Sequence, residues 1–120
     1  MHTVVETESF ASAAKEAGLS EAEVEPILEV VANNPKIGEV IPGTGGARKF
    51  RFAGRGKGKR GGYRVITYYA AEDVPVFLLD IYSKGKRINL TQAEKNELKA
   101  ILRTLADDWR RSVMEKVADL

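Results

Sequence analysis

Two cationic side chains two positions apart, Lys49 and Arg51, and a third at Arg64 are the residues of this chain best suited to act on a phosphate. A spacing of two places side chains on one face of a β-strand, and Phe50 and Phe52 then point to the other face. Burial of the phenylalanines would fix this register and leave the cations exposed. A neighbouring strand can bring Arg64 alongside, and arginine can hold a phosphate through two hydrogen bonds. The pattern predicts a phosphate cradle on a sheet.

The charge around these residues has one sign. Residues 40–71 contain no Asp or Glu, whereas residues 1–39 carry eight carboxylates against two lysines. Such a segregated cationic segment, interleaved with aromatic residues, is typical of a protein that binds a polyphosphate, and RNA is the favoured ligand. The further cations expected to contact phosphates of RNA or ribosome are Arg48, Arg55, Lys57, Lys59 and Arg60.

The same residues could cleave RNA through attack of a 2′-hydroxyl on the adjacent phosphate. One group must accept the hydroxyl proton while cations stabilise the phosphorane. Lys49 is our candidate acceptor, because crowding by Arg48, Arg51 and Arg64 penalises its charged form. The arginines would stabilise the transition state. Tyr82 and Lys84, at the end of the next apolar strand, are further candidates for contact with RNA. Tyr82 could stack on a base and Lys84 could contact a phosphate. An ordinary structural role at the end of a strand explains both residues equally well.

Other kinds of chemistry find little support. The chain has no cysteine, and its single histidine, His2, lies at a terminus that we expect to fray, so we expect no metal site and no cofactor. Gly56, Gly58 and Gly61 match a dinucleotide-binding pattern, but they lie between two strands rather than before a helix. The absence of a long apolar run or a signal peptide predicts a cytoplasmic protein with no membrane segment.

The fold expected to position these residues is a single α+β domain over residues 1–120, with helices packed on a small antiparallel or mixed sheet. Two helices are predicted near the N-terminus, over Ser9–Ala17 and from Ser20 to Asn33. In the second, Ser20 and Glu23 form a capping box, and Pro26 predicts a kink or a later start. The predicted strands are Thr3–Glu8, Ala47–Ala53, Gly62–Ala70 and Val76–Tyr82, the last apolar enough for the centre of the sheet.

A final helix is predicted from Thr91, where Thr91 and Glu94 form a second capping box. Lys95, Lys99 and Arg103 fall on its polar side. Its apolar residues recur at helical spacing, which predicts that one continuous stripe packs on the sheet. The residues of that stripe are Leu98, Ile101, Leu102, Leu105, Trp109 and Val113.

The chain resembles the RelE/HigB toxins of bacterial type II toxin–antitoxin modules, and most of all a HigB-like branch with a loop rich in glycine and lysine. The resemblance covers about residues 34–105. It depends on three motifs in order, G-T-G-G-x-R-K at 43–49, G-K-G-K-R-G-G-x-R at 56–64 and I-Y-x-K at 81–84.

This resemblance implies an mRNA endonuclease that acts in the ribosomal A site, halts translation and is neutralised by an antitoxin, which we expect to be a helix-turn-helix protein. The functional positions of the family fall on Lys49, Arg51, Arg64 and Lys84, the last of which is often arginine in relatives. RelE itself has a base-stacking tyrosine near its end, and here no tyrosine follows Tyr82.

Two other classes stay open on the sequence. One is an RNA- or ribosome-binding protein without catalysis, and the other is a ParE-like toxin that poisons gyrase, which the basic residues disfavour. The antitoxin could cover the basic residues, or it could bind the acidic N-terminal helices, which carry Glu16, Glu21, Glu23, Glu25 and Glu29.

Overall fold

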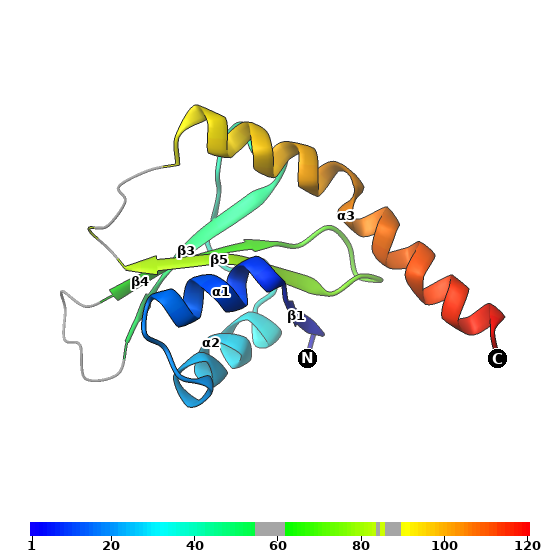
Figure 1. Cartoon of the computed structure of the whole chain (residues 1–120), viewed down its shortest axis with the longest axis horizontal. Coiled ribbons are helices and arrows are strands. Elements are labelled where there is room, and N and C mark those ends of the chain that lie inside the picture. The colour runs from blue at the N-terminus through cyan, green and yellow to red at the C-terminus, as the bar shows by residue number, and fades with distance from the viewer. Residues whose placement is uncertain (55–61, 84, 86–89) are drawn as a thin grey trace.

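The structure, a computed structural model, describes residues 1–54, 62–83, 85 and 90–120. It is an α+β fold in three layers, with a five-stranded mixed sheet between helices (Figure 1). Helices α1 (Glu8–Glu16) and α2 (Glu21–Asn33) cover one face, and α3 (Gln92–Ala118) lies against the other. The predicted fold class is confirmed. In the part of the chain that is described, no helix is both long and apolar enough to cross a membrane.

The sheet has the strand order β1-β5-β4-β3-β2. Its strands are β1 (Val4–Glu6), β2 (Glu39–Val40), β3 (Ala47–Ala53), β4 (Gly62–Tyr68) and β5 (Val76–Ser83). Strand β1 pairs in parallel with β5, and the other pairs are antiparallel. The four predicted strands are confirmed with small changes at their ends. The two-residue strand β2 was not predicted, and the central strand is β4 rather than β5, which lies between β1 and β4.

Both N-terminal helices begin at side-chain caps. Thr7 caps α1, and Ser20 forms the predicted capping box with Glu23 at the start of α2. Pro26 lies inside α2, and the helix still begins at Glu21, so the prediction of a later start is wrong. Apolar residues of both helices pack against one face of β3, β4 and β5. The buried residues of this layer that the helices contribute are Phe10, Ala14, Val24, Ile27 and Val31.

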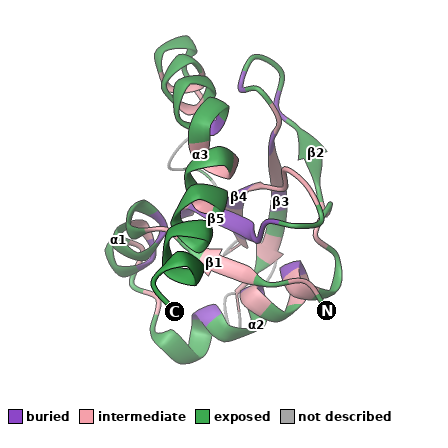
Figure 2. Ribbon diagram, turned by 90° about the vertical axis from the view of Figure 1, so that its right-hand side faces the viewer, coloured by how far each residue is buried: buried purple, intermediate pink, exposed green. Residues whose placement is uncertain are grey.

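The last helix extends beyond the sheet. Leu102 is buried, but Ile101 is 52% and Val113 is 42% exposed, so the prediction that the whole stripe packs on the sheet is wrong. A helix of 27 residues is about 40 Å long, whereas a strand of 8 residues such as β5 spans only about 26 Å. The far turns of α3 therefore project from the body, as the exposed turns near the C-terminus show (Figures 1 and 2).

The N-terminus is held by several contacts and does not fray as expected. The backbone N–H of His2 donates to the carbonyl of Ala32 at 2.9 Å, and its Nε2 lies 2.7 Å from the carbonyl oxygen of Val74. The imidazole and the ring of Tyr69 also pack edge to face, with centroids 5.3 Å apart. His2 therefore has a structural role, which is to hold the N-terminus against the rest of the domain.

Candidate functional site

Predicted site residues on three neighbouring strands lie side by side across the sheet. Arg51 on β3 is the register partner of Arg64 on β4, and Arg64 is the register partner of Tyr82 on β5. Register partners in antiparallel strands have Cα atoms about 4.5–5.5 Å apart. Lys49 lies two residues before Arg51 and pairs with Ile66. The predicted shared face of Lys49, Arg51 and Arg64 is therefore confirmed; we call these three residues the basic row.

Apolar packing on the two faces fixes this register. Phe50 is buried and Phe52 partly buried against the layer of α1 and α2, so the alternating Lys49 and Arg51 point to the other face. Arg51 is exposed, and Lys49 and Arg64 are half-buried. Because a one-residue slip would exchange the two faces, burial of the phenylalanines holds the cations in place.

Arg48 does not belong to the basic row. It alternates with Lys49 and therefore lies on the opposite face of β3. Its Nη1 donates to the carbonyl oxygens of Lys36 at 3.2 Å and Gly38 at 3.3 Å. The expectation that Arg48 crowds Lys49 is wrong, because its guanidinium binds the loop that precedes β2. Its predicted contact with RNA stays a prediction.

The backbone of Lys49 is packed against a glycine. Gly38 has a φ of +92°, and a Cβ placed on it would lie 2.2 Å from the carbonyl oxygen of Lys49. On the other side of β2, the buried hydroxyl of Thr44 donates to the carbonyl of Ile41 at 2.7 Å and accepts from the N–H of Ala47 at 3.0 Å. These contacts fix the path of the chain into β3 and hence the position of the basic row.

Tyr82 is covered by the beginning of α3. Only 7% of this residue is exposed, and it packs with Ile66, Leu79 and Leu102. An RNA base could stack on this ring only after Leu90 and the start of α3 had moved. Base stacking by Tyr82 stays a prediction for the RNA-bound state.

A hollow of about 160 Å³ lies where Lys49 meets the start of α3. It is lined by Ile41, Pro42, Lys49, Tyr82, Leu90 and Lys95. Lys95 was expected on the polar side of its helix, but it is half-buried and faces the same hollow as Lys49. Helical spacing alone could not reveal this, because it depends on how α3 crosses the sheet.

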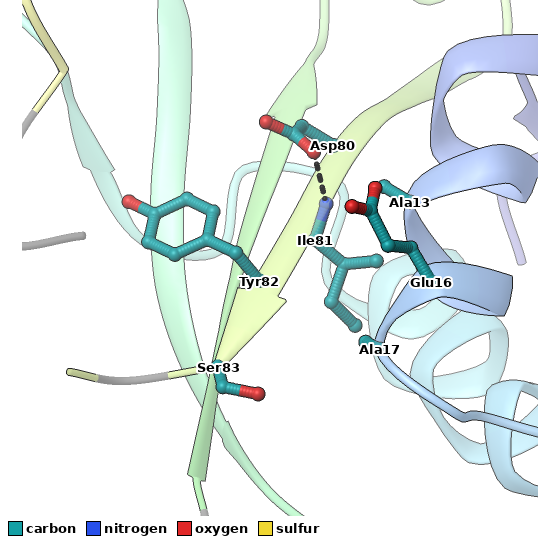
Figure 3. A pocket seen from close by; sticks show the side chains of 7 residues that line it. All are labelled: Ala13, Glu16, Ala17, Asp80, Ile81, Tyr82 and Ser83. Atoms are coloured by element: carbon teal, nitrogen blue, oxygen red, sulfur yellow. Dashed lines mark hydrogen bonds between the residues drawn. The ribbon is translucent and has the colours of Figure 1, made fainter. Parts of the chain in front are cut away.

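A carboxylate that the sequence did not single out borders the basic row. Asp80 is half-buried and is the register partner of Ile66, which in turn pairs with Lys49. Its Oδ1 accepts the N–H of Ile81 at 2.8 Å, and Glu16 of α1 points toward it (Figure 3). Both acids line a hollow of about 360 Å³ between α1 and the end of β5. Among the residues that the structure describes, the cationic surface therefore ends at β5.

Arg55, Lys57, Lys59 and Arg60 of the glycine-rich loop, and Lys84 after β5, lie outside the described residues. Within the described ranges, no group of three or more His, Asp or Glu side chains is arranged to hold a metal ion.

A small α+β domain whose sheet carries a row of cations is a scaffold for binding a phosphate backbone. Residues 2–119 match the family model described as the RelE toxin of the RelE/RelB toxin–antitoxin system. The chain belongs to this toxin family. Among solved structures, it is similar to that of an E. coli RelE mutant with two arginines changed to alanine, in the free state. The two share 21% sequence identity with a TM-score of 0.49, over 85% of this chain and 96% of the other.

Proposed function

We propose that this protein, as the toxin of a type II toxin–antitoxin module, is a ribosome-dependent endoribonuclease that cleaves mRNA in the A site and so inhibits translation. The observation that carries the proposal is the basic row, where Arg51 and Arg64 are register partners and Lys49 shares their face. Membership of the RelE toxin family supports the same activity. The proposal places the protein in the cytoplasm, where its substrate is, with an antitoxin of the helix-turn-helix type.

In the proposed reaction the 2′-hydroxyl oxygen of one nucleotide attacks the adjacent phosphorus. The new P–O2′ bond forms as the P–O5′ bond breaks, which leaves a 2′,3′-cyclic phosphate. The departing 5′-oxygen takes up a proton from water and becomes the 5′-hydroxyl. Lys49, at the edge of the hollow beside α3, accepts the 2′-hydroxyl proton. Arg51 and Arg64 stabilise the charge that develops on the phosphorane, and Lys84 assists at the phosphate. No metal ion is assigned, because the cations of the protein supply the positive charge.

The ribosome has a specific part in this proposal. The chain has one histidine, and it is engaged at the far side of the sheet by Val74 and Tyr69, so a histidine acid–base pair is not at hand. Cleavage then depends on an mRNA that the ribosome holds close to the attacking geometry. The loop residues Lys57 and Lys59 would strengthen association with the ribosome through phosphate contacts.

The test is to induce the protein without its antitoxin and to map RNA ends in the arrested cells. We expect cleaved message for the wild type, and a loss of cleavage rate of about 10²–10³-fold for Arg51→Ala and for Arg64→Ala. Arg103→Ala is the matched control, since this arginine is exposed on α3 away from the basic row. Intact messages in arrested cells would refute the nuclease, and DNA damage would indicate a gyrase-poisoning toxin instead. Absence of both arrest and cleavage would leave a non-catalytic RNA-binding protein.

The role of Lys49 has its own test. Lys49→Arg keeps the positive charge but removes a group that can accept a proton at neutral pH. If Lys49 is the proton acceptor, Lys49→Arg is as inactive as Lys49→Ala on programmed ribosomes. Substantial cleavage by Lys49→Arg would show that this position supplies charge alone.

A further inference from the structure

A groove between α1 and α2 lies on the face of the sheet opposite the basic row. Its volume is about 740 Å³. The two helices run side by side over the sheet, on the side away from α3 (Figure 1). The groove is lined by residues of both helices and of the turn between them, together with Glu6 of β1. The proposed cleavage reaction does not use this surface.

The groove has an apolar floor and acidic rims. Ala14 and Val24 are buried at the floor, and Leu19 and Leu28 are half-buried beside them. The exposed rims carry three carboxylates, Glu6, Glu21 and Glu25, against one cation, Lys15. The two helices together contain six glutamates against one lysine. This charge repels RNA, and the apolar floor is suited to the side chains of a protein.

We infer that this groove is the docking site of the antitoxin, which inserts apolar side chains of an amphipathic helix and directs lysines or arginines at the glutamates. The inference rests on the proposed function, because the antitoxin is the partner that the toxin family implies. Charge complementarity selects a basic segment for an acidic groove. A helix such as α2, with 13 residues, is about 20 Å long, and a partner helix of similar length matches it.

The basic row is a poorer site for the same partner. Its neighbour Tyr82 is already covered by α3, and Arg51 and Arg64 offer mainly charge. Stable protein interfaces need a buried apolar centre in addition to charged rims. The groove provides both, and its use leaves the basic row uncovered.

The experiment measures binding of the cognate antitoxin to the toxin and its variants. Ala11→Trp fills the groove from an exposed position on α1, and Ser12→Trp is the matched control, exposed on the same helix but outside the groove. We expect Ala11→Trp to raise Kd by about tenfold or more, mostly through faster dissociation, and Ser12→Trp to bind like the wild type. Equal affinity of the wild type and Ala11→Trp would overturn the inference.

A second pair of variants tests the charge of the rim without touching the floor. Glu25→Lys should slow association by about tenfold at low salt, and the effect should fade at high salt because charges are then screened. Glu115→Lys makes the same charge change on the projecting part of α3 and should have no such effect. Equal association rates for the two variants would contradict the charge argument.

Toxicity separates this inference from the proposed function. In the absence of antitoxin, Ala11→Trp and Glu25→Lys should arrest growth as the wild type does, since both lie across the sheet from the basic row. A wild type that causes no arrest would refute the proposed function. Variants that remain toxic and are neutralised normally would refute docking of the antitoxin in the groove and would leave the proposed function standing. Hydrogen exchange of the complex should protect α1 and α2, and protection confined to β3 and β4 would also exclude this docking mode.

Discussion

Replacing Gly38 with alanine should weaken both the fold and the cleavage activity, because the added methyl group has no room. It would lie 2.2 Å from the carbonyl oxygen of Lys49 and 3.1 Å from the Cβ of Phe50. The backbone must therefore separate by about 0.8 Å to reach even the 3.0 Å that real Cβ atoms respect. That separation moves Lys49, the proposed proton acceptor.

The size of the effect follows from two costs. The φ of +92° at Gly38 costs an alanine about 1–2 kcal/mol, and forcing an extra methyl group into a packed site costs about 1–3 kcal/mol. We expect the free energy of unfolding to fall by the sum, about 2–5 kcal/mol. Displacement of a catalytic group by about 1 Å can lower the rate by 10²-fold, so cleavage on ribosomes should fall by a similar factor.

Urea unfolding and cleavage of message on programmed ribosomes measure the two effects. Gly18→Ala is the control, because Gly18 has a similar φ of +80° but nothing within 4 Å of the added methyl group. It should lose only the conformational cost, about 1–2 kcal/mol, and keep its activity. If the two variants were equally stable and equally active, contact between Gly38 and Lys49 would not be what holds β3 in place.

Three further predictions concern stability. The hydrogen bond from Arg110 lowers the pKa of Asp73 below its ordinary 3.8. This ion pair should therefore help to anchor α3 at neutral pH and lose that effect as the pH falls through the lowered pKa. Amide exchange of α3 should differ between the wild type and Asp73→Asn at pH 7, and should be the same in both well below pH 3.8. The buried hydroxyl of Thr67 has no partner among the described residues, so Thr67→Val should raise the free energy of unfolding in urea by about 1 kcal/mol, and a decrease would contradict this. Deleting residues 113–120, which project from the body, should change the melting curve little, whereas Leu102→Ala, at a buried position, should cost about 2–5 kcal/mol.

The sequence was sufficient to predict most of the local elements, though not the short strand β2, and the contents of the basic row. Alternation in β3 assigned Lys49 and Arg51 to one face, because burial of Phe50 and Phe52 permits only one register. Capping boxes at Ser20 and Thr91 marked the starts of α2 and α3, because a polar side chain there satisfies backbone N–H groups within the same turn. These features depend on residues a few positions apart, and a sequence displays such relations directly.

Only the tertiary structure decided what surrounds the row. Lys95 and Leu90 reach the hollow beside Lys49, and Tyr82 is covered, because α3 crosses the sheet at a particular place. The same stripe of apolar residues is buried at Leu102 and exposed at Val113, since a periodic pattern does not record where the sheet ends. Arg48 was expected to crowd Lys49, although alternation along a strand puts neighbouring side chains on opposite faces. Its contact with the loop at Gly38 also depends on where that loop lies in space. Each of these outcomes depends on segments far apart in the chain, whose packing is set by the whole core rather than by neighbouring residues.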